Sequence, residues 1–451
     1  MSKTGNGERG ARLGERLNGV KRVAITTLGC KTNQFESAAM SESLAEAGYE
    51  SVPFSEVADI YIINTCTVTA RSDAESRRLV RRAARLSPAS RIVVTGCYAQ
   101  LAAAELAALP NVSLVMGNSE KRGIVSLLAS LDSEARVQVA DIGRVTGAEA
   151  LHLESFAEHT RAFLQVQNGC DSFCSYCIVP FARGRSRSVP LAEVLVGARK
   201  SAAAGFMEVV LTGIHLGAYG LDLEPKRSLL ELIQGIAADG FVRRLRVGSV
   251  EPNELTKDFI SFMAASPILC PHLHLPLQSG SAAVLASMGR KYSPELILDL
   301  VAGLVAAIPD ISIGFDVIAG FPGESEADHA ATCKLIAALP IAYLHVFPYS
   351  SRPGTAAAAM PAHLQPSVVK RRAEELRRLG ERKRLEFAAR FSGRDLQVLI
   401  QGDGSSGIAR NYLSVKLAGE VATAGEEVVV RITGANPDGS CRGIIPISSA
   451  L

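Results

Sequence analysis

The chain has 451 residues, of which 47% are hydrophobic and 21% charged, and its formal net charge is +3. This length exceeds what one hydrophobic core usually fills, so we expect two or three domains. The small net charge excludes a strong overall attraction to nucleic acid, so any such affinity must come from local patches. The longest apolar runs are only strand-sized, well short of the about 20 residues that cross a membrane, so no membrane association is expected.

Nine cysteines and the absence of a secretory signal peptide predict a cytoplasmic protein whose thiols bind metal rather than form disulfides. Cys270, Cys333 and Cys441 have no partner at a metal-binding spacing and are expected to be structural. Residues 1–20 are polar and rich in glycine and arginine, which predicts a disordered tail.

Residues 21–145 alternate short β-rich runs with alanine-rich helical stretches. This alternation predicts a first domain built as an open parallel α/β sheet with helices on both faces. The predicted strands are 23–27, 59–63 and 91–95, and the predicted helices are 41–48, 71–86 and 100–109.

A cysteine follows each of these three strands: Cys30, Cys66 and Cys97, here called the strand-end trio. Ligands of open α/β sheets bind outside the carboxyl ends of the strands, so the three thiols are expected to lie near one another. One cysteine at a strand end is usually a small buried hydrophobic residue, but three in the same topological position predict a metal cluster. The neighbouring Gly29 and Gly96 would let the backbone approach such a bulky group.

The second predicted helix is rich in arginine. Arg77, Arg81 and Arg85 are spaced to form one stripe along it, with Arg78 and Arg82 beside them. Such a face is often simply solvated, but few acidic residues are interleaved here, so contact with phosphates is an equal alternative.

Residues 155–390 contain six apolar strands, and a helical stretch follows at least the first five. Repeated strand–helix units predict a partial (β/α)6 barrel with its active site at the carboxyl ends of the strands. Six units instead of eight leave one side open, which suits a macromolecular substrate and a second domain docked over the mouth. The predicted strands are 163–166, 208–211, 244–247, 272–275, 311–317 and 343–346.

Cys170, Cys174 and Cys177, here called the loop trio, follow the first barrel strand in a C-x3-C-x2-C pattern. Thiolates this close can bind one 4Fe–4S cluster, and three protein ligands leave one iron open to a small molecule. The alternative is a structural zinc site, which usually needs a fourth cysteine or histidine nearby, and His159 is too far away.

Polar residues after the other barrel strands are candidates for binding a cofactor. Ser249 and Glu251 could serve a ribose or an amino group, although Glu251 also precedes a proline in a turn pattern. Thr212 and Gly213 could instead form a helix-capping turn, and Gln278 could belong to an ordinary loop. The candidates are Tyr176, Thr212, Gly213, Ser249, Glu251, Gln278 and Asp316, the last at the end of the fifth strand.

Arg183, Arg185 and Arg187 alternate directly after the loop trio. Such cations could stabilise a reduced cluster or hold a phosphate or carboxylate, and the alternative is an ordinary solvated loop. The histidines of the barrel, His215, His272 and His274, are expected to be core or rim residues rather than metal ligands.

A strongly charged helical pattern at 370–390 is expected to connect to a last domain at 391–451. There the pattern changes to β-runs separated by turns rich in glycine, aspartate and asparagine, which predicts a small β-barrel. The predicted strands are 396–400, 407–417, 427–432 and 442–445.

These features together resemble the radical S-adenosylmethionine (SAM) methylthiotransferase family. The three predicted domains are similar to its amino-terminal domain, its radical SAM barrel and its RNA-binding TRAM barrel. The segments 27–33, 63–69 and 95–100 are most similar to the branch that acts on threonylcarbamoyladenosine in tRNA.

The resemblance implies a transferase that methylthiolates C2 of N6-threonylcarbamoyladenosine at tRNA position 37. The loop trio would hold a 4Fe–4S cluster that binds and cleaves SAM, and the resulting radical would take hydrogen from C2. The strand-end trio would hold a second 4Fe–4S cluster that carries the sulfur, methylated by a second SAM.

The implied partners are the tRNA anticodon loop, a reductant protein and a sulfur source, with neither DNA nor a membrane. Alternative substrates are isopentenyladenosine in tRNA, a ribosomal protein or an unrelated molecule. A non-enzymatic iron–sulfur RNA-binding protein is the alternative of a different class, although it would not need the open iron of the loop trio.

Overall fold

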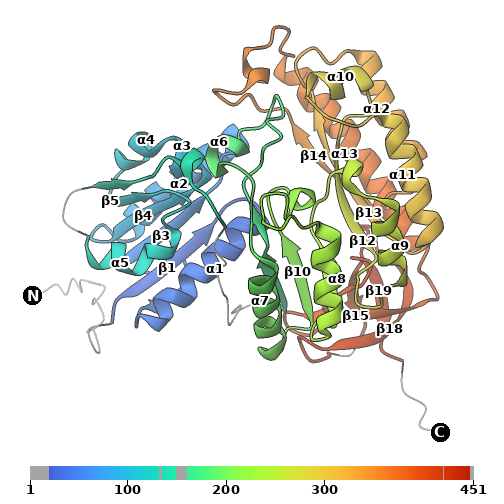
Figure 1. The fold of residues 1–451 in the computed structure, drawn as a ribbon, viewed down its shortest axis with the longest axis horizontal. Coiled ribbons are helices and arrows are strands. Elements are labelled where there is room, and N and C mark those ends of the chain that lie inside the picture. The colour runs from blue at the N-terminus through green and yellow to red at the C-terminus, as the bar shows by residue number, and fades with distance from the viewer. Residues whose placement is uncertain (1–19, 132–134, 149–159, 420, 447–451) are drawn as a thin grey trace, which may run out of the picture.

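The computed structural model describes residues 20–131, 135–148, 160–419 and 421–446. His159, and the tail expected at residues 1–20 except for Val20, therefore lie outside the described residues. The chain forms, in order, a parallel sheet, a partial barrel of parallel strands and a small closed barrel (Figure 1).

The amino-terminal sheet has six parallel strands in the order β2-β1-β3-β4-β5-β6. β3 and β4 are almost entirely buried, as their continuous apolar and β-branched runs predict. The strands are β1 (Arg22–Thr27), β2 (Glu50–Ser51), β3 (Ile60–Thr65), β4 (Arg91–Gly96), β5 (Val112–Met116) and β6 (Arg136–Gln138).

Helices cover both faces of this sheet. One apolar cluster joins it to α1 and α5, and a second joins it to α2, α3 and α4. The helices are α1 (Lys31–Glu46), α2 (Ala70–Leu86), α3 (Cys97–Leu101), α4 (Ala103–Ala107) and α5 (Ile124–Ala129).

Helix α1 begins at Lys31 rather than at residue 41, where the sequence predicted it. Its first half buries polar side chains, including Asn33 and Glu36, so it lacks the apolar periodicity by which a helix is recognised. The helix predicted at 100–109 is divided into α3 and α4, and the short strands β2, β5 and β6 were not predicted.

The central barrel contains six parallel strands in chain order. Its two three-stranded sheets are joined by single bridges between Leu245 and Leu269 and between Ser249 and His274. β7 and β14 end the row, which confirms the predicted partial barrel with one open side. The strands are β7 (Arg161–Gln165), β10 (Glu208–Thr212), β11 (Arg244–Val247), β12 (His272–Gln278), β13 (Ser312–Ala319) and β14 (Tyr343–Pro348).

A helix follows each barrel strand, including the last, and packs on the outer face in one large apolar cluster. The helices are α7 (Leu191–Ala203), α8 (Leu229–Asp239), α9 (Lys257–Ala265), α10 (Ala282–Ser287), α11 (Pro294–Ala307), α12 (Glu326–Ala338) and α13 (Pro366–Ala389). The connection from β7 to α7 contains β8 (Gln167–Asn168), α6 (Val179–Arg183) and β9 (Arg187–Ser188). No helix in the described ranges is both long and apolar enough to span a bilayer.

The carboxyl-terminal strands close into a small barrel in the order β15-β16-β17-β19-β18, as predicted. The single strand predicted at 407–417 is a hairpin instead, because a turn containing Tyr412 in the left-handed region divides it. The strands are β15 (Asp395–Gln401), β16 (Ser406–Ala409), β17 (Ser414–Leu417), β18 (Glu427–Ala435) and β19 (Cys441–Ile444).

A buried ion network joins this small barrel to the amino-terminal ends of the central strands. The carboxylate of Glu208 accepts hydrogen bonds from Arg244 Nε at 3.0 Å and Arg246 Nε at 2.8 Å, and all three side chains are fully buried. The same guanidiniums donate to the carbonyls of Ile408 at 3.2 Å and Arg410 at 2.9 Å. The hairpin β16–β17 is therefore held against the floor of the central barrel.

Replacing Glu208 with glutamine should destabilise the fold by about 3–5 kcal/mol, because buried Arg246 loses its carboxylate partner and buried Arg244 keeps only Glu427. Urea denaturation at neutral pH measures this loss. The control is Asp310→Asn, which breaks a half-exposed pair with Arg394 and should cost less than about 1 kcal/mol. Equal losses in the two variants would contradict the structural role of Glu208.

The loss in Glu208→Gln should depend on pH. Burial alone would raise the pKa of Glu208, but Arg246 and Arg244 hold it at about 2, below its ordinary 4.5. Its contribution is therefore complete above pH 4.5 and is lost as the pH falls through about 2. Wild type and variant should converge in stability over that range, whereas a constant difference would rule out an ionised Glu208.

Candidate active site

The strand-end trio lies at one edge of the amino-terminal sheet. β1, β3 and β4 are neighbours, and the pairing of Thr65 with Gly96 places Cys66 level with Cys97. Cys30 caps α1, and Cys97 is the first residue of α3. The three strands therefore deliver their cysteines side by side, as the sequence predicted.

Gly29 and Gly96 make this arrangement possible. Their backbones have φ of +100° and +97°, which residues with a Cβ rarely adopt. A Cβ at Gly29 would lie 2.9 Å from Cys66 Cβ and 3.0 Å from its Sγ. Glycine is thus required at Gly29 for the turn and for the close approach to Cys66.

The thiols of this trio influence one another. Burial raises the pKa of Cys66 to about 11, and the nearby Cys97 and Cys30 add to the rise. Three neighbouring thiolates repel one another, and a bound metal cluster would relieve this repulsion.

In the loop trio, too, the neighbouring thiols influence one another's pKa. Burial raises the pKa of Cys177 to about 12, and Cys174 and Cys170 contribute. Burial would also raise the pKa of Cys170, but hydrogen bonds from His215 and Ser172 outweigh it and lower the value. His215 Nδ1 lies 3.7 Å from Cys170 Sγ, so this histidine belongs to the cysteine site and not merely to the core or rim.

Both trios supply three cysteine thiols, the usual ligands of an iron–sulfur cluster. Zinc holds sulfur at about 2.3 Å, so the ligands of one ion must crowd together. In the described part of the chain, two groups of three side chains have their ligand atoms within 4.8 Å of one another, close enough to hold a single metal ion. Neither group contains a cysteine of either trio. Three wider-spaced thiols fit a 4Fe–4S cluster better than a single ion.

Arg183 belongs to the strand-end trio, although it follows the loop trio in sequence. Its Nε donates to Cys97 Sγ at 3.1 Å, and its guanidinium pairs with Glu36 and donates to the side chain of Asn33. Lys121 forms a second ion pair with Glu36. Arg183, Glu36 and Lys121 are almost completely buried, so this network fixes α6 of the barrel region against α1.

The solvated-loop alternative for 183–187 is therefore wrong at two of the three arginines. Arg187 is buried and donates to the carbonyls of Arg185 at 2.9 Å and Arg183 at 3.0 Å. Arg185 is exposed, with Asp171 at 3.5 Å. The expected cation beside a cluster exists, but it contacts the other trio.

A second polar link joins the segment after Cys66 to the loop after β14. Arg352 forms an ion pair with Asp73 and donates to Thr67 Oγ1 at 2.7 Å. The backbone N–H of Ala70 donates to Ser350 Oγ at 3.0 Å. These contacts hold residues 67–70 over the mouth of the barrel.

Arg290 is a site residue that the sequence did not reveal. Its Nη1 donates to Cys174 Sγ at 3.2 Å, and its guanidinium pairs with Glu251. Burial raises the pKa of Glu251, although Arg290 opposes the rise. More than a hundred residues separate Arg290 from Cys174, so no local spacing could have indicated the contact.

A cavity of about 180 Å³ lies between Cys177 of the loop trio and the segment that follows Cys66. Tyr176, Cys177, Gln278 and Asp316 line it from the barrel, while Val68 and Thr69 line it from the segment after Cys66. Gln278 is buried with φ of +61°, a strained conformation that often marks functional sites.

The other predicted cofactor residues lie elsewhere or in a different setting. Thr212 is buried at the end of β10, where its carbonyl accepts from Val166. A Cβ on Gly213 would lie 2.9 Å from Leu216, so the glycine serves close packing. Ser249 forms, with His274, one of the two bridges that join the halves of the barrel.

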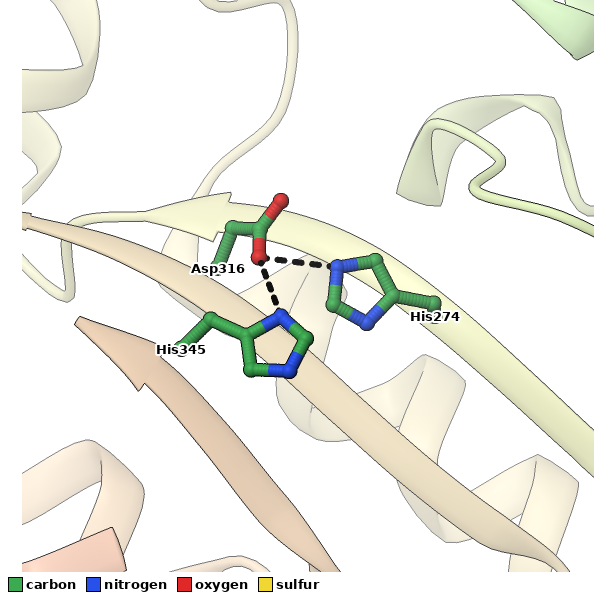
Figure 2. A group of neighbouring side chains, drawn as sticks. All are labelled: His274, Asp316 and His345. Carbon is green, nitrogen blue, oxygen red and sulfur yellow. Dashed lines mark hydrogen bonds and ion pairs between the residues drawn. The ribbon is translucent and has the colours of Figure 1, made fainter. Parts of the chain in front are cut away.

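Asp316 lies inside β13 rather than at its end, which corrects its predicted position. Its Oδ1 accepts from His274 Nε2 at 2.8 Å and from His345 Nδ1 at 3.2 Å (Figure 2). Burial alone would raise the pKa of Asp316, but these hydrogen bonds hold it at about 2. Asp316 is therefore an ionised acceptor with both imidazoles turned toward it.

Comparison with known proteins agrees with this site. Residues 22–117 match the uncharacterized protein family UPF0004, and residues 164–336 match the radical SAM superfamily. The solved radical SAM methyltransferase TsrM of Kitasatospora setae, at 17% identity, aligns over 75% of each chain with a TM-score of 0.53, which supports the fold alone. The chain is a radical SAM enzyme.

Curated relatives define it further. The threonylcarbamoyladenosine tRNA methylthiotransferase MtaB of Bacillus subtilis is 37% identical over 91% of this chain and 93% of its own length. MtaB of Aquifex aeolicus is 38% identical over 88% and 97%. A tRNA-2-methylthio-N(6)-dimethylallyladenosine synthase of Cereibacter sphaeroides is 34% identical over 94% and 98%. The chain therefore belongs to the radical SAM tRNA methylthiotransferase family.

These relatives confirm the methylthiotransferase family that the sequence motifs indicated, and the two from B. subtilis and A. aeolicus carry the name of its threonylcarbamoyladenosine branch. They also make the chain a transferase, which removes the alternative of a non-enzymatic iron–sulfur binding protein.

Replacing Arg183 with methionine should destabilise the protein by about 3–5 kcal/mol, because Glu36 keeps only Lys121 and the link between α6 and α1 is lost. Urea denaturation measures the loss. Arg185→Met, two residues away and exposed, is the matched control and should cost less than about 1 kcal/mol. Equal losses of stability in the two variants would show that the buried network does not hold α6 and α1 together.

Proposed function

We propose that this chain transfers a methylthio group to C2 of N6-threonylcarbamoyladenosine at tRNA position 37. The observation that carries the proposal is the cavity bounded by Cys177 of the loop trio and by Val68 and Thr69, which follow Cys66. A base held there would have C2 between the group that activates it and the group that donates sulfur. The names of the relatives from B. subtilis and A. aeolicus support the choice of nucleoside.

We infer that each trio holds a 4Fe–4S cluster with one open iron. When bound, the loop-trio cluster with SAM supplies a radical that removes hydrogen from C2, and the strand-end cluster supplies the sulfur. Arg290 donates to Cys174 and Arg183 to Cys97. Hydrogen bonds of this kind withdraw charge from the ligand sulfurs and make a cluster easier to reduce.

The substrate base must leave its stack to enter the cavity, as bases do in enzymes that modify them. An anticodon loop makes this inexpensive, because its bases are already unpaired. The open side of the barrel suits such a substrate. We further propose that the reaction takes place in the cytoplasm, with a reductant protein and a sulfur source as partners.

Cysteine variants should separate the two trios. Cys174→Ala should abolish SAM-dependent formation of 5′-deoxyadenosine, because the loop trio loses a ligand. Cys66→Ala should still form 5′-deoxyadenosine but transfer no methylthio group. Chromatography of both products after reduction makes the measurement, with Cys333→Ala in α12 as the unaffected control. Full product from Cys66→Ala would remove the second cluster from the proposal.

The arginine stripe of α2 should contribute to tRNA affinity through its exposed members. Arg77 is already engaged with Tyr98 and with Glu105 at 3.1 Å, whereas Arg81 and Arg85 are exposed. Replacing Arg81 and Arg85 with alanine should weaken tRNA binding and reduce the slope of log affinity against log salt by about 1.5.

The control for that prediction is Arg378→Ala with Arg382→Ala, which removes two exposed arginines at the same spacing on α13. Titration of labelled tRNA at several salt concentrations compares the three proteins. If the double variant of α2 binds tRNA as tightly as wild type does, the arginine face of α2 is simply exposed to solvent and does not contact phosphates.

Mass spectrometry of tRNA nucleosides from cells with and without the gene tests the function directly. Loss of 2-methylthio-threonylcarbamoyladenosine, with accumulation of its precursor, is the expected result. Loss of the methylthio group from the isopentenyl nucleoside instead would keep the family and replace the substrate. Unchanged tRNA nucleosides would point to a protein substrate, such as a ribosomal protein.

A further inference from the structure

Three side chains of the central barrel form a group that is separate from both cysteine trios: His274 of β12, Asp316 of β13 and His345 of β14 (Figure 2). Asp316 lies directly opposite His345 in the parallel pairing of β13 with β14. His274 lies opposite Gly314, two residues before Asp316 and on the same face of the sheet. The register of three neighbouring strands therefore brings one carboxylate and two imidazoles together. We call them the His–Asp–His group.

The ligand atoms of this group have the spacing of one metal ion's ligands. Asp316 Oδ1 lies 2.8 Å from His274 Nε2 and 3.2 Å from His345 Nδ1, and all three atoms lie within 4.8 Å of one another. Ligand atoms on adjacent corners of an octahedron, each about 2.1 Å from the ion, are about 3.0 Å apart. Both separations from Asp316 are close to this value, so the group needs little movement to admit an ion.

Both imidazoles have what a metal-bound histidine needs at its second ring nitrogen. An ion on His274 Nε2 leaves the ring proton on Nδ1, and the hydroxyl oxygen of Tyr343, 3.1 Å away, can accept a hydrogen bond from it. The Tyr343 hydroxyl can then donate to His272 Nε2 at 2.8 Å. The His345 side chain is 56% exposed, so water can accept from its Nε2–H. Such partners fix the tautomer and the orientation of a metal-bound histidine.

The His–Asp–His group can be reached from outside. Asp316 lines the cavity beside Cys177, and His345 lines a second cavity of about 660 Å³ bounded by β14, α13 and the small barrel. Within the described residues Asp316 forms no ion pair with a lysine or an arginine, so its charge is available to a metal. Three protein ligands leave further positions of the ion free for water or for an oxygen of a bound molecule.

The donor set restricts which ions fit. Ca²⁺ and Mg²⁺ are bound mainly by oxygen, and this group has only one carboxylate. Two imidazole nitrogens and one carboxylate oxygen suit divalent ions of the first transition series, and this combination is the common facial triad of non-haem iron sites. The absence of a thiol from the group also distinguishes its chemistry from that of the cysteine trios.

We propose that the His–Asp–His group is a mononuclear site for a divalent first-row transition-metal ion, in addition to the two cysteine sites. His274 Nε2, Asp316 Oδ1 and His345 Nδ1 are its ligands, and Tyr343 is a positioning residue that acts through His274. Since Asp316 also lines the cavity beside Cys177, an ion held here offers a position for an oxygen ligand at the wall of that cavity.

Titration of the cluster-loaded enzyme with Mn²⁺ tests the assignment, because thiolates select softer metals than this ion. The electron paramagnetic resonance signal of free Mn²⁺ in ultrafiltrates measures how much is bound. Wild type should bind one Mn²⁺ per chain, and Zn²⁺, which binds such sites more tightly, should displace it. Asp316→Asn and His345→Ala each remove a ligand and should weaken binding more than about tenfold, and Tyr343→Phe should weaken it about tenfold.

The control is Glu375→Gln on α13. Glu375 belongs to the other group whose ligand atoms are close enough to hold an ion, together with His329 and Cys333, and its side chain is half exposed. This variant should bind Mn²⁺ as wild type does.

A wild type without saturable Mn²⁺ binding overturns the assignment, and so does binding that survives both Asp316→Asn and His345→Ala. Loss of binding in Glu375→Gln alone would place the ion between α12 and α13 and also overturns it. Thermal unfolding checks that each variant is folded, and the half-exposed ring of His345 keeps the test valid if Asp316→Asn does not fold. The titrations use no tRNA, so their outcome is separate from that of the proposed function.

Discussion

The guanidinium of Arg183 is fully buried between the amino-terminal sheet and the barrel, where it meets the carboxylate of Glu36 and the sulfur of Cys97. Lys121 completes the charge balance from a third segment. Removing any one of these charges would leave the others buried without full charge compensation and shielded from water. The distance between the two cysteine trios therefore depends on this ion network together with the apolar packing of Phe35 and Ala39 of α1 against the barrel.

The same principle recurs at the other junctions of the chain. Arg352 and Asp73 hold the segment after Cys66 over the barrel mouth, and Glu208 with its arginines holds the carboxyl-terminal barrel at the floor. Polar junctions require defined angles and distances, whereas apolar surfaces can slide. A reaction between two separate cofactor sites benefits from that rigidity, since a small error in spacing would separate the reacting atoms.

Much of the fold was accessible from the sequence because continuous apolar runs mark buried parallel strands, and cysteines at their ends mark the site. The predicted strands ending before Cys30, Cys66 and Cys97 agree with the structure to within two residues. The partners of Arg183 and Arg290 were not accessible, because they come from distant segments whose approach no spacing encodes. The start of α1 was missed for a related reason: its buried side chains are polar and belong to the domain junction.

The floor of the central barrel also bears on how such a protein can change over evolutionary time. Two arginines of the catalytic barrel donate hydrogen bonds to backbone carbonyls of the β16–β17 hairpin. A small barrel appended for RNA binding alone could be exchanged or lost without consequence. Here its inheritance is tied to the sequence of β10 and β11, so the module can be swapped only together with the strands on which it rests.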